Sequence, residues 1–235
     1  AATYLGTAPQ IPLKIVAVHR GAGFSSNGVV LIDDGVFRRK SIDSLTAMNI
    51  AEAAAKLWIG GSIAVNGEGY GIIREGLSRY IATEFIDSKY GKDVADIERL
   101  RQRNAYAAIA RRDGAMLRIS PLDDLYYASV ANKGAMAWRL IAKRIGKTEF
   151  STVITNNAKD GSLEMPELRT ALSANSELAD YLFDQITNMN LMIGKPQELP
   201  GEVKFAMRNT GVIDATVNVR VILAGGQSME APTTV

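Results

Sequence analysis

The sequence predicts a mixed α/β fold, mainly helical, with a small sheet at its N-terminal side and strands of an incomplete β-sandwich after it. Two apolar runs near the N-terminus have the length of strands, and the middle of the chain carries helix start and stop signals. Near the C-terminus, apolar and polar residues alternate in places, which is typical of β-strands. We therefore expect a first domain over residues 1–198 and a second, truncated one over residues 199–235.

The first domain is expected to begin with two strands, Leu13–Val18 and Gly28–Ile32. Between them lie the turn signals Gly21–Gly23 and Ser25–Gly28, which are rich in Gly, Ser and Asn. His19, the single histidine, directly follows the first strand. No nucleophile motif accompanies it, so we interpret it as a structural or exposed residue at a strand end.

Helical segments are expected from residue 44 onward. The first runs from Ser44 to Trp58 and closes at Gly60–Gly61, where glycine suits a helix end. The glycine-rich stretch at residues 67–71 is expected to be a turn, because it lacks the spacing and the Lys-Ser/Thr pair of a phosphate-binding loop. The later helices are expected at Ile72–Tyr90, Val94–Arg112, Ala131–Ile145, Glu164–Ser173 and Ser176–Asn188.

The composition changes at Pro196–Pro200. Beyond it, Glu202–Arg208 and Ala215–Leu223 have strand patterns and are expected to be joined by a turn at Asn209–Gly211. Two strands do not make a stable domain by themselves. We therefore expect further strands, from a longer chain or from another chain, to complete this region.

Composition excludes several classes of function. The chain has no cysteine and one histidine, so disulfides, thiolate nucleophiles and iron–sulfur clusters are excluded. With 27 Lys and Arg against 25 Asp and Glu, its net charge of +2 does not favour nucleic acid as a partner. The sequence contains neither a signal peptide nor an apolar run long enough for a membrane span. It predicts a soluble chain of unknown compartment, and a processed or truncated exported protein also fits.

Four segments, in the same order and at similar spacing, resemble the gluzincin metallopeptidases of the membrane alanyl aminopeptidase and leukotriene-hydrolase type. Ile50–Gly60 resembles their first zinc-binding helix, and Arg74–Tyr80 resembles the second. The eighteen residues 57–74 match the spacer of that family. Leu125–Ala135 resembles its Tyr-x-Lys-Gly-Ala region, and Ala22–Gly28 stands where the family has Gly-x-Met-Glu-Asn.

The resemblance covers roughly residues 3–195 and implies the thermolysin-like catalytic-domain fold, with residues 200–223 resembling the β-sandwich that follows it. The family binds zinc through two histidines and a glutamate, with a glutamate as general base, a tyrosine at the oxyanion and a glutamate at the substrate amine. Five of these six positions differ here. Glu52 and Lys56 replace the histidines, Ala53 the base, Ala131 the tyrosine and Ser25 the amine-binding glutamate, and Glu75 alone matches.

The resemblance therefore implies a pseudoenzyme: an aminopeptidase-like domain with no catalytic residue, no metal and no cofactor, and a structural or peptide- or protein-binding role. Its partners would be a protein, a peptide or other domains of a longer chain. Cleft residues suggested by the alignment are Ser25, Ser26, Tyr127 and Arg79. One alternative is an active metallo-aminopeptidase whose zinc site is divergent or completed by a partner chain. Another is an enzyme that uses two glutamates as an acid/base pair, as glycosidases do.

The former metal-site positions also have a physical interpretation of their own. Glu52 and Lys56 are spaced i,i+4 in the favourable order, with Glu before Lys. If the fold is kept, Glu75 points at the same place. We expect a buried cluster in which the Lys56 ammonium replaces the charge of the metal, rather than an exposed Glu–Lys pair of little energetic consequence.

Overall fold

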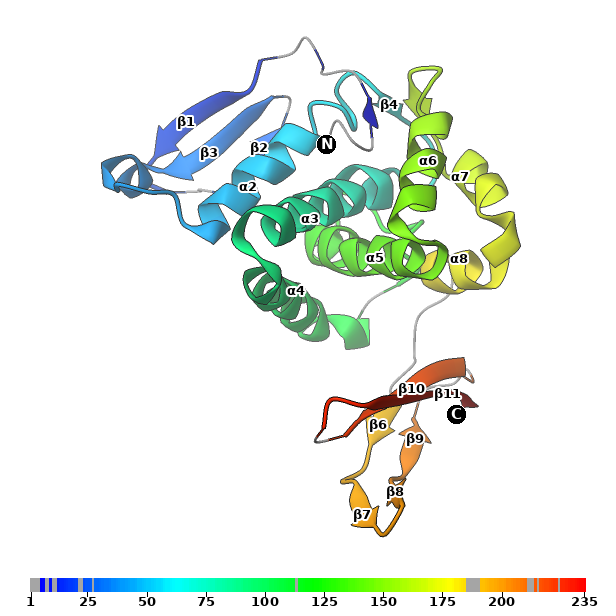
Figure 1. The fold of residues 1–235 in the computed structure, drawn as a ribbon. Helices are drawn as coiled ribbons and strands as arrows, with labels where there is room; N and C mark the ends of the chain where they lie inside the picture. Colours follow the sequence, from blue (N-terminus) through cyan, green and yellow to red (C-terminus); the bar gives the residue numbers. More distant parts are fainter. Residues whose placement is uncertain are drawn as a thin grey trace. The chain divides into compact units, whose positions relative to one another are not determined.

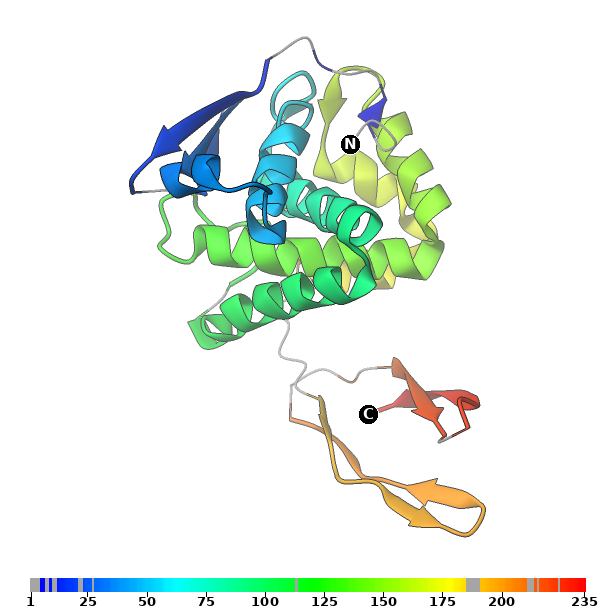
Figure 2. The same cartoon turned by 60° about the vertical axis from the view of Figure 1, so that its left-hand side comes forward.

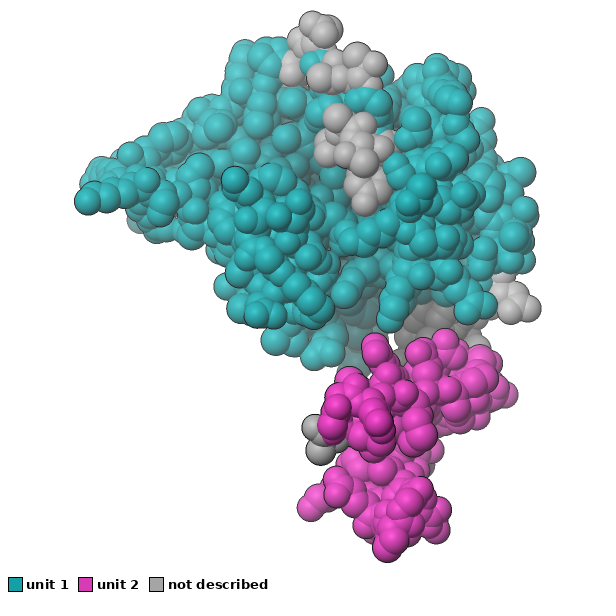
Figure 3. Space-filling model, viewed as in Figure 1, with its two compact units in different colours: residues 1–185 teal, residues 186–235 magenta. Residues whose placement is uncertain are grey.

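A computed structural model describes residues 5, 6, 9, 12–20, 23–26, 28–112, 114–184, 191–210, 214, 216–223 and 225–235. The chain is mixed α/β, as predicted, and forms two compact units, Ala1–Gln185 and Ile186–Val235 (Figure 3). This division lies earlier in the chain than the expected boundary at residues 198 and 199. The reason is that the strand β6 (Leu191–Ile193) pairs within the second unit, with β9 (Met207–Asn209).

A three-stranded sheet of order β1-β3-β2 opens the first unit (Figure 1). The predicted strands are confirmed as β1 (Lys14–Val18) and β3 (Val29–Asp33), which pair in parallel. A short strand that was not predicted, β2 (Ser25–Ser26), pairs antiparallel with β3. The expected turn residues 21, 22 and 27 lie outside the described residues. Val30 and Ile32 of β3 are buried against the first long helix, which fixes the sheet beside it.

That helix, α2 (Ser44–Ala55), begins as predicted, with the Asp43 carboxylate accepting the Thr46 N–H at 2.8 Å. The expectation that it runs to Trp58 is wrong. The amides of Leu57 and Trp58 bond to carbonyls three residues earlier, so the last turn tightens and the helix ends. Lys56 keeps its bond to the Glu52 carbonyl at 3.1 Å, which preserves the i,i+4 relation of these two residues.

Two helices of the core begin with a π-helical turn. The turn η2 (Ile72–Leu77) continues into α3 (Ser78–Tyr90), and η4 (Ala128–Lys133) continues into α5 (Gly134–Ile145). Between them lies α4 (Lys92–Ala107). Helix α3 packs against α2, α4 and α5, as Figures 1 and 2 show. The helix expected over Val94–Arg112 therefore ends early, and only a short 3₁₀ turn, Ala110–Arg112, follows it.

The remaining helices cover the C-terminal part of the first unit. The structure adds one helix that was not predicted, α6 (Lys147–Asn157), directly after Gly146 at φ 91°. The expected helices near residues 164 and 176 are confirmed as α7 (Met165–Ala171) and α8 (Ser176–Phe183); residues 185–188 of the second lie outside the described residues. The unit also contains the parallel strand pair β4 (Ala64–Val65) and β5 (Ser162–Leu163) and the 3₁₀ turns Asp34–Arg38 and Ser173–Asn175.

Aromatic residues form the centre of the core. Trp138 packs against Phe150 and Phe183, with ring centroids 6.0 and 5.0 Å apart, and Tyr80 meets Phe150 edge-on at 5.4 Å. The Trp138 indole N–H donates to the carbonyl oxygen of Ile72 at 2.9 Å. The core thus holds the first residue of the π-helical turn η2 directly.

The second unit contains, among its described residues, three antiparallel strand pairs. Besides β6 with β9, they are β7 (Gln197–Leu199) with β8 (Glu202–Lys204) and β10 (Thr216–Ile222) with β11 (Ser228–Thr234). The expectation that one strand over 202–208 turns back onto 215–223 is wrong, because the first run divides into two strands with other partners. Residues 211–213 and 215 of the expected turn and strand lie outside the described residues.

Gly76 of η2 lies directly against the backbone of η4 and of the first residue of α5, Gly134. A Cβ on Gly76 would lie 2.8 Å from the Val130 carbonyl oxygen and 3.0 Å from the Gly134 Cα, both backbone atoms. We expect Gly76→Ala to lower the free energy of unfolding by about 1–3 kcal/mol, because the helices must move apart. Urea unfolding followed by far-UV circular dichroism measures this.

The matched control is Gly114→Ala, whose Cβ would meet no described atom within 4 Å. Its free energy of unfolding should stay near that of the unchanged chain. Equal stability of the two variants would contradict the role of the glycine contact.

Candidate functional site

The Lys56 ammonium lies between two carboxylates in the interior of the first unit. Its Nζ is 3.0 Å from Glu52 Oε1 and 2.5 Å from Glu75 Oε2, and it donates to Ser25 Oγ at 3.4 Å. The Lys56 side chain is 3% exposed, and both glutamates are buried. An ammonium has three N–H donors, and each has a partner here. The sequence prediction of a buried Glu52–Lys56–Glu75 arrangement is confirmed, and the alternative of an exposed pair is wrong.

Arg79, one turn after Glu75, binds the other side of Glu52. Its Nε donates to Glu52 Oε2 at 2.9 Å, and its two terminal nitrogens donate to Tyr127 Oη at 2.9 Å and Asn132 Oδ1 at 2.5 Å. The Tyr127 hydroxyl in turn donates to Glu52 Oε1 at 2.7 Å. The Glu52 carboxylate therefore accepts from a lysine, an arginine and a tyrosine.

Arg74 completes the arrangement by donating from Nη1 to Glu75 Oε1 at 2.5 Å. Gly60 makes room for it, because a Cβ there would lie 2.9 Å from Arg74 Nε. We call the whole set the ionic cluster. It consists of Ser25, Glu52, Lys56, Arg74, Glu75, Arg79, Tyr127 and Asn132.

The charges of the ionic cluster set its protonation. Burial by itself raises the pKa of Glu52, but the charges of Arg79 and Lys56 outweigh it and lower that pKa below its ordinary value of 4.5. Burial, and then the charge of Glu52, raise the pKa of Tyr127 well above its ordinary value. At neutral pH the carboxylate is therefore ionised and the phenol keeps its proton.

This donor set does not fit zinc. Zinc requires ligands with a free lone pair, and the group between Glu52 and Glu75 is an ammonium, which has none. Among the described residues there is also no group of three or more His, Asp or Glu side chains suited to a metal ion. An acid/base pair of the glycosidase kind fits no better, because the same ammonium binds both carboxylates.

The other residues singled out by the sequence lie outside the ionic cluster. Ala53 packs against Val30 and Ile32, and Ala131 is fully buried in η4, so neither side chain offers a reactive group. Ser26 is half-buried in β2 and makes no side-chain hydrogen bond to the described part of the chain. His19 is exposed and its Nδ1 lies 3.0 Å from Asp34 Oδ2, as suits a histidine at a strand end.

Two members of the ionic cluster were not predicted, Arg74 and Asn132. Arg74 had a signal, because it directly precedes Glu75 and a cation beside a buried carboxylate is a natural partner. Asn132 had none, since its contact with Arg79 spans 53 positions and depends on how η4 packs against α3. The contact between Asn132 and Arg79 therefore follows from tertiary packing, which no local pattern in the sequence indicates.

Comparison with known proteins identifies a fold and no sequence family. No family model matches the chain, and no curated protein matches it. The fold resembles the M1 zinc metallopeptidase from Deinococcus radiodurans, with a TM-score of 0.55 and 14% identity over 77% of this chain. A variant of that peptidase gives a TM-score of 0.57 at 13% identity, and a two-domain M1 zinc metallopeptidase variant bound to L-tryptophan gives 0.58 at 13%, each over 79% of this chain.

These matches confirm a mixed α/β fold like part of an M1 metallopeptidase; the thermolysin-like and β-sandwich detail stays a prediction. The chain spans only 42% of the length of the structures it matches. Along the described residues, no helix combines the length and the apolar character that crossing a membrane requires.

Removal of the central cation tests the energetic role of the ionic cluster. We expect Lys56→Ala to lower the free energy of unfolding by about 3–5 kcal/mol, because the buried carboxylates of Glu52 and Glu75 would lose the cation that they share and would repel each other. Urea unfolding followed by the helical circular dichroism signal measures this. Lys92→Ala is the control. The Lys92 side chain is 75% exposed and pairs with Asp96 at i,i+4. Its removal should change the free energy of unfolding no more than a typical surface substitution. A loss below about 0.5 kcal/mol for Lys56→Ala would rule out the cluster as a structural element.

The lowered pKa of Glu52 predicts an acid-sensitive fold. Because this pKa is lower in the folded than in the unfolded chain, the stabilisation is complete above pH 4.5 and is lost as the pH falls through the folded-state value. Urea unfolding at a series of pH values should show this loss. In Glu52→Gln the loss should be smaller, since the titrating group is gone. Equal losses in both proteins would contradict the assignment.

Proposed function

We propose that this chain is a catalytically inactive domain of the zinc-aminopeptidase type, in which the ionic cluster replaces the metal centre and the role is structural. The observation that carries the proposal is the Lys56 ammonium between Glu52 and Glu75. These are the positions that resemble the three metal ligands of the family. A positive charge held between two carboxylates supplies the local neutralisation that a metal ion would otherwise provide.

The chemistry available at these positions supports inactivity. Metal-assisted peptide hydrolysis needs a Lewis acid, a general base for water and a donor to the oxyanion. Ala53 and Ala131 offer no such base or donor, and both are buried. The Tyr127 hydroxyl donates to Glu52 and accepts from Arg79, so it is already committed within the ionic cluster.

The closed hydrogen bonding of the ionic cluster favours a structural role over the binding of a peptide at this place. All three donors of Lys56 have partners, and each nitrogen of the Arg79 guanidinium donates once. A peptide would have to break these bonds in order to use the same groups. The cluster instead joins four separate segments of the sequence: β2, α2, the continuous η2 and α3, and η4.

A domain of this kind would serve within something larger. The second unit leaves Met192, Ile193 and Ile222 more than half exposed, and its strand pairs fit the first part of a β-sandwich. Other domains of a longer chain, or a protein partner, would complete it. The matched structures are more than twice as long as the region they share with this chain, which supports the same proposal.

Metal content and turnover test the proposed inactivity. We expect protein purified without chelator to contain no stoichiometric zinc by elemental analysis and to release no product from aminoacyl anilides, because its donor set is an ammonium and two carboxylates. About one zinc per chain, with hydrolysis that a chelator abolishes, would favour instead an active aminopeptidase with a divergent site.

A variant that restores the ligand set provides the matched control. If the three positions face one point, Glu52→His with Lys56→His should retain zinc through dialysis together with Glu75. The same variant with Glu75→Gln should lose it. Equal zinc retention by these two variants would show that the alignment of the metal-site positions is wrong.

A further inference from the structure

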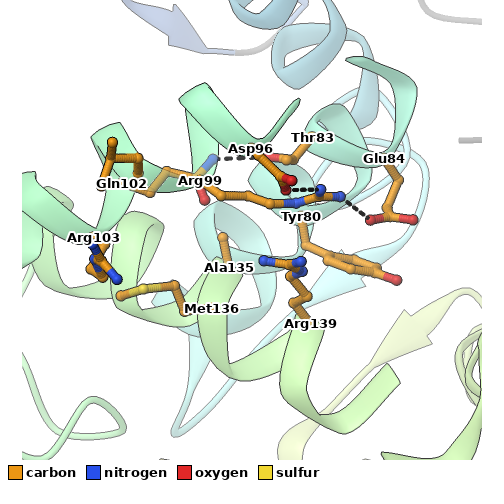
Figure 4. Close-up of a pocket in the computed structure, with 11 residues that line it drawn as sticks. Tyr80, Thr83, Glu84, Asp96, Arg99, Gln102, Arg103, Ala135, Met136 and Arg139 are labelled. Atoms are coloured by element: carbon orange, nitrogen blue, oxygen red, sulfur yellow. Dashed lines mark hydrogen bonds and ion pairs between the residues drawn. The ribbon is translucent and has the colours of Figure 1, made fainter. Parts of the chain in front are cut away.

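A groove with a cavity of about 340 Å³ lies between helices α3, α4 and α5 (Figure 4). No member of the ionic cluster lines it, so binding at this groove is independent of the proposed inactivity. The groove is lined by three arginines, of which Arg99 and Arg103 come from α4 and Arg139 from α5. We call it the arginine groove.

Arg99 already has its counter-ions. Its Nη2 lies 3.2 Å from Glu84 and 2.5 Å from Asp87, and its Nη1 lies 2.7 Å from Asp96. Its side chain is 11% exposed, so it is fixed in the wall of the groove. Figure 4 shows the guanidinium directed toward Asp96 and Glu84, at one end of the lining residues.

Arg103 and Arg139 lack such partners. Neither makes a hydrogen bond or an ion pair with the residues that the structure describes, and both are exposed. Arg103 follows Arg99 by four positions and so lies on the same side of α4. In Figure 4, Met136 lies between Arg103 and Arg139. The two carboxylates that line the groove, Glu84 and Asp96, are bound by Arg99. Arg103 and Arg139 are therefore the cations of the groove that attract an anion.

The chemistry of the lining narrows the choice of anion. Guanidinium groups bind carboxylates through paired, planar hydrogen bonds. Beside them lie Met136 and Leu100, and Leu100 is 44% exposed, so apolar side chains also find a surface here. A net charge of only +2 does not favour nucleic acid.

We propose that the arginine groove binds an acidic segment of a partner protein. Carboxylate side chains of the segment pair with Arg103 and Arg139, and an adjacent apolar side chain covers Leu100 and Met136. This assigns a protein-binding surface to the groove between α3, α4 and α5, whose lining contains none of the residues that resemble the metal site.

Fluorescence anisotropy with a labelled peptide tests the proposal on the full chain. The probe is a short peptide of alternating Glu and Leu, and the control probe carries Gln in place of Glu. We expect the acidic probe to bind and Arg103→Gln with Arg139→Gln to weaken that binding about tenfold or more. Arg38→Gln with Arg118→Gln removes the same charge from exposed arginines outside the groove and should leave affinity unchanged.

The competing outcomes are distinct. Equal binding of the Glu and Gln probes, or equal loss in the two double variants, would overturn the proposal, because charge at this groove would then not decide binding. Binding of inorganic phosphate that needs Arg103 and Arg139, with no binding of the peptide, would overturn the proposal and assign the groove to a small anion. Circular dichroism of each variant establishes that it folds, so loss of binding is not loss of structure.

Discussion

The organisation of the first unit depends on one buried cation, the ammonium of Lys56. Burying an ion is costly unless its hydrogen bonds are all made, and here two carboxylates and a serine hydroxyl satisfy it. The partners come from different elements: Glu52 from α2, Glu75 from η2 and Ser25 from β2. A cation at this point therefore joins the sheet and two helices. Removing it leaves Glu52 with Arg79 and Glu75 with Arg74, but no cation between the two buried carboxylates. The packing of these elements therefore depends on their electrostatics.

The charges around the Lys56 ammonium also explain why the site does not suit a divalent metal ion. Two carboxylates face three cations, Lys56, Arg74 and Arg79, so the local net charge is positive. A divalent metal ion entering this space would be repelled and would find both carboxylates occupied. The low pKa of Glu52 follows from the same charges. One arrangement thus accounts for the poor fit to zinc and for the acid sensitivity.

Local signals predicted the parts of the structure that depend on local sequence. The i,i+4 spacing of Glu52 and Lys56 placed both on one side of α2, and the resemblance to a metal site added Glu75. The pairing of the C-terminal strands was predicted wrongly, because register there depends on β11, whose exposed residues give no apolar alternation. Helix α6 was missed because its Thr, Val and Ile residues have low helix propensity and its stability comes from burying Phe150.

The two π-helical turns were beyond any sequence signal, yet they position the site. Turn η2 carries Glu75 and turn η4 carries Asn132, and Gly76 of η2 packs against the Val130 carbonyl of η4 and against Gly134, where α5 begins. Such turns are frequent at functional sites, because one inserted residue redirects the side chains around it. Here they direct a carboxylate to Lys56 and an amide to Arg79. The packing of these two turns thus decides which side chains meet in the ionic cluster, and the fold by itself does not decide the chemistry of its sites.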